Sequence, residues 1–140
     1  MPKLTLKLSR NMNKKLLIIG SGWEQKALVE QAKNMGFIII ASHPFLNSDG
    51  FLLSDRHYIR DADDIHSHYN IALENKVDGI VTDNCDYSYY TASVVASKLG
   101  LPFSTIENGI ACIDKTHQRN KCAKVPKILQ PKFAELRTYE

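Results

Sequence analysis

The residues best suited to chemistry in this sequence form a short turn, Gly20-Ser21-Gly22. The turn follows the apolar run from Leu16 to Ile19 and precedes a segment with helical spacing of apolar residues. Glycine lets backbone amides approach a ligand closely, and the first turn of a helix attracts anions through its free N–H groups. The turn therefore predicts a site for a phosphate or carboxylate group, although the same glycines also suit a purely structural strand-to-helix turn.

A nicotinamide dinucleotide is one ligand that such a turn can bind. The motif G-x-G-x-x-G has its third glycine where this sequence has Gln25. The second predicted strand ends in Ala41-Ser42-His43, without the Asp or Glu that would bind a ribose. Both departures disfavour a dinucleotide. Ser42 and His43 remain candidate contacts for another small molecule, although a loop histidine such as His43 often has no such role.

A second polar loop, after the fourth predicted strand, contains Asp83, Asn84 and Asp86. We expect these side chains to hydrogen-bond an amine or hydroxyl group of a substrate. Asn84 or Asp86 could instead cap the helix that follows. His66 and His68 are not expected to share a metal ion, because two residues spaced by two on a helix point about 200° apart.

The elements that position these loops alternate along the chain. Apolar runs predict strands over 16–19, 37–41, 57–59 and 77–81 and a short fifth one over 101–103, and helical spacing predicts helices over 23–35, 65–74, 87–99 and 106–113. This order predicts a doubly wound, Rossmann-like α/β domain, a three-layer sandwich with a mainly parallel sheet of four to five strands. In such a sheet, ligands bind at the carboxyl ends of the strands, where both loops are expected.

Charge and composition exclude several classes of function. Residues 1–15 carry five Lys or Arg and no acid, residues 16–114 carry six against thirteen Asp or Glu, and residues 115–140 carry seven against two. The acidic body disfavours nucleic-acid binding, which requires a basic face. No apolar run approaches the ~18 to 20 residues of a membrane span. Three cysteines without C-x-x-C spacing favour reduced thiols, and without a secretory pattern we expect a cytoplasmic protein.

Three segments carry a resemblance to a known family: Val77-Asp78-Gly79-Ile80-Val81-Thr82, Lys98-Leu99-Gly100-Leu101-Pro102, and Asp114-Lys115 followed by Arg119 and Val125-Pro126. In residues and spacing they resemble the first domain of ATP-grasp enzymes and its junction with the nucleotide-binding domain. Carbamoyl-phosphate synthase, biotin carboxylase and the purine-biosynthetic carboxylases are members. The order of the earlier elements, from the glycine turn to a loop that ends at Asp55, is also similar, so that the resemblance covers residues 15 to about 133.

The resemblance implies a division into three parts: a flexible basic leader at 1–13, a pre-ATP-grasp domain at 14–113, and at 114–140 the start of a linker into an ATP-grasp domain that this sequence lacks. It implies that Lys115 and Arg119 contact ATP phosphates, although Lys115 also fits an ordinary surface lysine. The full-length ligase is expected to use ATP and Mg²⁺ to form an acyl phosphate that an amine captures. We expect this chain alone to be inactive, with neither ATP nor Mg²⁺ bound, and a homodimer is compatible with the family.

A second hypothesis comes from another class of protein. The chain could be a stand-alone Rossmann-like module that binds a metabolite or nucleotide and has a regulatory role. The tail separates the two hypotheses, because its apolar positions fit no clean amphipathic helix and would need another domain to cover them. As part of a ligase, the residues beyond about Val125 are expected to be mobile or to pack against a neighbouring chain.

Overall fold

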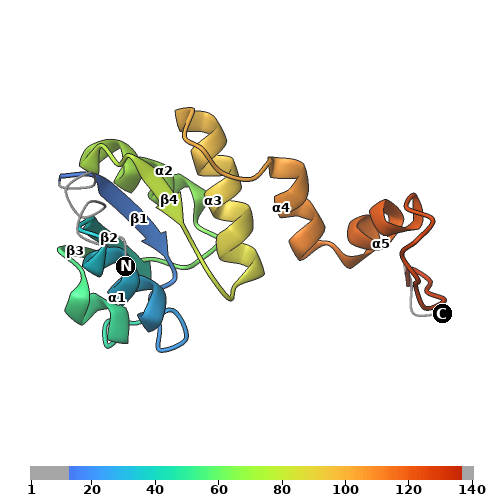
Figure 1. Cartoon of the computed structure of the whole chain (residues 1–140), viewed down its shortest axis with the longest axis horizontal. Helices are drawn as coiled ribbons and strands as arrows, with labels where there is room; N and C mark the ends of the chain where they lie inside the picture. Colours follow the sequence, from blue (N-terminus) through green and yellow to red (C-terminus); the bar gives the residue numbers. More distant parts are fainter. Residues whose placement is uncertain (1–12, 137–140) are drawn as a thin grey trace, which may run out of the picture.

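The computed structural model describes residues 13 to 136, so the predicted leader lies outside the described residues except for Asn13. Within residues 13 to 136, four strands and five α-helices follow one another, with a short 3₁₀ helix, η3, after the second strand (Figure 1). Their bounds are β1 Lys15–Ile19, α1 Lys26–Asn34, β2 Ile38–His43, η3 Asp49–Leu53, β3 Arg56–Ile59, α2 Ile65–Asn75, β4 Gly79–Val81, α3 Asp86–Leu99, α4 Ile106–Ile113 and α5 Lys115–Ala123. All strand pairs are parallel, in the order β3-β2-β1-β4. The predicted α/β fold class is confirmed.

The three layers follow from successive residues of the inner strands, which point to opposite faces of the sheet. On one face, Leu17 and Ile19 of β1 join a buried cluster with residues of α2 and α3. On the other face, Ile18 of β1 joins a cluster with residues of α1 and with Phe51 of η3. Because both faces of β1 and β2 are covered, these strands are apolar along most of their length rather than alternating.

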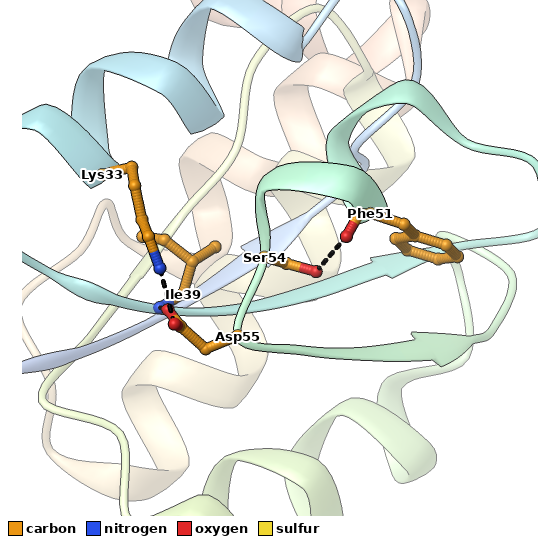
Figure 2. Close-up of polar contacts among 5 residues, drawn as sticks. All are labelled: Lys33, Ile39, Phe51, Ser54 and Asp55. Atoms are coloured by element: carbon orange, nitrogen blue, oxygen red, sulfur yellow. Dashed lines mark hydrogen bonds and ion pairs between the residues drawn. The ribbon is translucent and has the colours of Figure 1, made fainter.

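The edge of the sheet next to β3 is fixed by Asp55 (Figure 2). Its carboxylate accepts hydrogen bonds from the backbone N–H of Ile39, at 2.8 Å, and from Lys33 Nζ, at 2.5 Å. Just before it, Ser54 Oγ donates to the carbonyl of Phe51 at the end of η3. Burial opposes ionisation of Asp55, but Lys33 and the amide of Ile39 outweigh it, so the pKa of this carboxyl lies below its usual 3.8. Asp55 thereby connects α1, β2 and the start of β3.

Several helix ends carry residues that terminate or cap the helix. Gly100, directly after α3, and Gly36, which follows the C-cap Met35 of α1, adopt left-handed backbone conformations with φ of 66° and 84°. At the start of α2, the Asp64 side chain accepts a hydrogen bond from the Ser67 amide. None of the helices among residues 13 to 136 is long and apolar enough to cross a membrane.

The structure corrects two expectations. Residues 101–103 form no strand: the Leu101 amide bonds back to the Ala96 carbonyl, Pro102 has no N–H, and Leu101 and Phe103 pack against the core instead. The first helix begins at Lys26 rather than Trp23, because Gly22 to Gln25 form a turn closed by a hydrogen bond between the Gln25 amide and the Gly22 carbonyl. Within the segment predicted as a linker, Lys115–Ala123 form the helix α5, which lies beyond α4 and away from the sheet (Figure 1).

Candidate functional site at the carboxyl ends of β1 and β4

The glycine turn after β1 is held by bonds to the end of β2 and to the segment before η3. Gly20 has a φ of 89°, and its N–H donates to the Ser42 carbonyl at 3.0 Å. Ser21 is fully buried, and its Oγ donates to the same carbonyl at 3.3 Å. The Ser21 carbonyl accepts from the Gly50 amide at 2.8 Å and from Ser48 Oγ. The Ser21 side chain therefore shapes the turn from inside and does not reach its outer surface.

Ser42 is also turned inward. It is 1 % exposed, and its Oγ lies 2.8 Å from Nε2 of the buried His68. His68 Nδ1 is 2.7 Å from the Asp64 carbonyl, an acceptor, so Nδ1 carries the proton and Nε2 accepts from Ser42. Burial lowers the pKa of His68 below its usual 6.5, although Asp64 opposes this effect. The imidazole ring is therefore neutral at pH 7, and its hydrogen bond with Ser42 Oγ holds the end of β2 in place.

Gln25 lies between the β1 and β4 loops. Its Oε1 accepts a hydrogen bond from the Gly22 amide at 3.0 Å, and its Nε2 donates to the Asp83 carbonyl at 3.1 Å. The side chain is 6 % exposed. Gln25 stands where the dinucleotide motif has its third glycine. Its side chain therefore joins the turn after β1 to the loop after β4. β1 lies between β2 and β4 in the sheet, so these loops meet where the strand order reverses, the position at which such sheets bind ligands.

The loop after β4 presents its polar side chains outward. Asp83, Asn84 and Asp86 are all exposed. Neither Asn84 nor Asp86 caps α3: the N-cap residue is Cys85, and it makes no side-chain capping bond. Asn84 instead takes a left-handed conformation with φ of 56°, which asparagine tolerates better than most residues. With the capping role excluded, the Asp83 carboxylate is available for a ligand, and the exposed Asp86 carboxylate has Lys115 Nζ as a neighbour at 3.8 Å.

His43 approaches the glycine turn from the end of β2. A Cβ added at Gly22 would lie 3.0 Å from His43 Nε2. The Phe45 amide donates to His43 Nδ1 at 3.2 Å, so a neutral His43 carries its proton on Nε2, beside Gly22. Gly20 to Gly22, Gln25, His43 and the loop from Asp83 to Asp86 together form what we call the loop site.

An open pocket of about 340 Å³ has Pro44, the residue after His43, in its wall. It is lined by Pro44, Ile59, Arg60, Asp61, Asp64 and Ser67. The pocket therefore lies at the carboxyl ends of β2 and β3, next to the first turn of α2.

The two predicted ATP contacts lie on α5. Lys115 Nζ is 3.8 Å from Asp86 Oδ2 and 3.4 Å from the Cys112 carbonyl, and its side chain is 69 % exposed. The Arg119 guanidinium lies over the Phe133 ring, 5.8 Å from its centroid. Lys115 therefore adjoins the loop site, whereas Arg119 holds the tail. Within residues 13 to 136, no group of three or more His, Cys, Asp or Glu is placed to hold a metal ion.

Gln25 and Ser88 were not among the predicted site residues, but both side chains border Gly20 of the glycine turn. Gln25 could have been found because it replaces the third glycine of the turn motif, and a long polar side chain there must find partners. Ser88 gave no signal, since a serine in the first turns of a helix is common. It is 1 % exposed, and its Oγ has no hydrogen-bond partner among residues 13 to 136.

Known proteins resemble this chain in fold rather than in sequence. No protein-family model and no curated protein matches the sequence. Among solved structures, phosphoribosylglycinamide synthetase from Anaerococcus prevotii matches 80% of this chain and 29% of its own, with 26% identity and a TM-score of 0.72. N5-carboxyaminoimidazole synthetase from Staphylococcus aureus, in complex with ADP, matches 81% and 30%, with 15% identity and a TM-score of 0.67.

The biotin carboxylase domain of Hydrogenobacter thermophilus 2-oxoglutarate carboxylase, a dimer with MgADP and bicarbonate, matches 82% of this chain and 28% of its own. Its identity is 14% and its TM-score 0.64, so this likeness shows the fold. The chain spans about 30% of the length of these enzymes. By this match, the chain has the fold of the N-terminal domain of ATP-grasp enzymes.

Proposed function

We propose that this chain is the substrate-side domain of an ATP-dependent ligase that joins a carboxylate to an amine through an acyl phosphate. The observation that carries the proposal is the extent of the structural match, about 80% of this chain against about 30% of each neighbour. The neighbours named as complexes of ADP or MgADP support the use of ATP and Mg²⁺. Residues 14–113 form the domain in this proposal, and 114–140 begin the linker into an ATP-grasp domain.

The loop site is where we place the substrate. The Nε2–H of His43, which lies beside Gly22, and the Gly22 amide, whose acceptor in this structure is Gln25 Oε1, are two donors that suit an anionic oxygen. Asp83 and Asp86 offer exposed carboxylates to an amine or hydroxyl. The hydrogen bonds of Gly20, Ser21 and Ser42 hold the backbone of the loop site in place, and both serine side chains point inward.

The described residues supply only part of the contacts that an ATP site requires. Lys115 is a flexible point charge that suits phosphate, but it lies on the surface with Asp86 as its neighbour. Arg119 is engaged with Phe133. We therefore propose that the ATP-grasp domain provides most ATP contacts and covers the exposed apolar tail residues Val125, Ile128, Leu129, Phe133 and Leu136. A cytoplasmic location and a homodimer are part of the same proposal.

The proposal is tested by measuring ADP release from the natural-length protein in the presence of ATP, Mg²⁺ and pairs of carboxylates and amines. The proposal expects ADP release that requires both partners and falls in Asp83→Asn. The matched control is Asp49→Asn, an exposed carboxylate on η3. ATP turnover that is indifferent to both partners, with Asp83→Asn equal to the control, would contradict the proposal. Tight binding of a nucleotide by the 140-residue chain alone would favour the stand-alone module.

A further inference from the structure

The Gln25 side chain occupies the donor of the loop site that best suits an anion. In this structure the Gly22 amide does not face an open surface, because Gln25 Oε1 accepts its hydrogen at 3.0 Å. The other end of the same carboxamide is bonded to the Asp83 carbonyl at 3.1 Å. A substrate oxygen that binds to Gly22 must therefore take the place of Gln25 Oε1.

A second observation points to a ligand at the same place. Ser88, in the first turns of α3, is 1 % exposed, and its Oγ has no hydrogen-bond partner among the described residues. A Cβ added at Gly20 would lie 3.5 Å from Ser88 Oγ and 3.8 Å from Gln25 Cδ, so both side chains border the space beside Gly20. A buried hydroxyl without a partner is costly and calls for an explanation. Gln25 is another residue whose side chain lies within 4 Å of the added Cβ.

We propose that the Gln25 carboxamide is displaced by an anionic group of the substrate, and that its movement uncovers Ser88 Oγ as a further hydrogen-bond donor to that group. The proposal rests on the proposed function, since it concerns the substrate of the same loop site. Gln25 is a positioning residue that closes the site before binding, and Ser88 is a binding residue that acts after Gln25 has moved.

The exchange is chemically favourable. A charged phosphate or carboxylate oxygen accepts hydrogen bonds more strongly than the neutral Oε1 of a carboxamide. Gln25 loses two hydrogen bonds to backbone groups, one to Gly22 and one to Asp83, and an exposed carboxamide can replace both with water. Uncovered, Ser88 Oγ gains the partner that it lacks in the closed arrangement.

The test uses the 140-residue chain and follows the Gly22 amide by NMR during titration with inorganic phosphate and, separately, with acetate. These two probes share the anionic oxygen, and the one that binds more tightly identifies the substrate group as phosphate or carboxylate. Gln25→Ala should tighten binding roughly ten-fold if the open arrangement is populated at about 10%. Gln25→Met should do the same while keeping the volume of the side chain, and Ser88→Ala should weaken binding. Gln31→Ala and Ser97→Ala, exposed positions on α1 and α3, are the matched controls and should leave binding unchanged.

The outcomes separate this inference from the proposed function. If wild type binds an anion at Gly22 but neither Gln25 variant binds more tightly, the displacement of Gln25 is wrong and the substrate site stands. If Gly22 responds to neither anion in any variant, both are wrong. If Gln25→Ala does not fold, hydrogen exchange decides: the Gly22 amide should be protected in the unliganded wild type and exchange rapidly in Gln25→Met, and equal exchange rates would overturn the inference.

Discussion

Lys115 Nζ lies 3.8 Å from Asp86 Oδ2, a contact that joins the first turn of α5 to the first turn of α3. The contact places Lys115, which is predicted to bind ATP phosphates, beside Asp86, which is predicted to bind the substrate. Both side chains are largely exposed, at 69% and 60%. Solvent screens such a pair, and its contribution to folding is correspondingly small.

Lys115→Ala should therefore leave the stability of the chain nearly unchanged, within about 1 kcal/mol in urea unfolding. In the natural-length protein the same change should reduce ADP release, because we assign the ammonium group to phosphate. Lys124→Ala, an exposed lysine after α5, is the control and should affect neither quantity. A large loss of stability in Lys115→Ala would mean that the residue holds α5 in place rather than serving ATP.

Gly50→Ala should destabilise the fold because the added Cβ would lie 2.6 Å from the Ser21 carbonyl oxygen and 2.8 Å from Ser21 Cβ. The carbonyl oxygen and the Cβ of Ser21 are both fixed by the Ser21 backbone and cannot yield easily, so we expect a cost of about 1–3 kcal/mol in urea unfolding. Gly79→Ala is the matched control: its Cβ would meet only Leu16 Cδ2, at 3.0 Å, and that end of a side chain can move. Equal costs at the two positions would show that the glycine turn is not packed as described.

Asp55→Ala should cost more than Lys33→Ala. Removing the carboxylate leaves the half-buried Ile39 amide without its acceptor, a loss of about 1–3 kcal/mol, whereas removing Lys33 only breaks a partly exposed ion pair, about 0–1 kcal/mol. Because the folded pKa of Asp55 lies below 3.8, its stabilisation is present above that pH and is lost as the pH falls through the folded value. Acid unfolding curves of wild type and Asp55→Ala should therefore converge at low pH, and parallel curves would contradict this assignment.

His68 should make the fold sensitive to mild acid. Its folded pKa is lowered by burial, so below the usual 6.5 the unfolded chain takes up a proton that the folded chain resists. Stability should fall as the pH drops from about 6.5 by up to ~1.4 kcal/mol per pH unit, until the folded pKa is reached. His68→Gln should flatten this slope between pH 5 and 6.5, whatever its effect on absolute stability. His66→Gln, an exposed histidine on the same helix, should keep the wild-type slope, and a slope that survives in His68→Gln would assign it elsewhere.

The sequence was sufficient for the fold because local signals agree with the layered arrangement. The runs at β1 and β2 are apolar on both faces, and the ends of α1, α2 and α3 carry recognisable capping residues. The short segment from Leu101 to Phe103 was mistaken for a strand because apolar residues there pack on the core without pairing in the sheet. α5 escaped prediction because it has few apolar residues, and its signal is the Asp114 side chain that accepts from the His117 amide.

The loop site could be located from sequence but its inner arrangement could not. The turn after β1 and the loop after β4 meet as the parallel sheet requires. Nothing local reveals that Ser21 and Ser42 point inward, since that depends on partners such as Ser48 and His68 from other elements. The role of Gln25 depends in the same way on the Asp83 carbonyl.

The most direct measurement of the central claim is a calorimetric titration of the 140-residue chain with MgATP, repeated while the amide spectrum is recorded. A substrate-side domain whose ATP site lies in another domain should show no saturation below about 1 mM, an affinity of roughly −4 kcal/mol or weaker. Micromolar affinity, with shifts at the Gly22 and Ser88 amides, would contradict the account and identify the chain as a self-sufficient nucleotide-binding module.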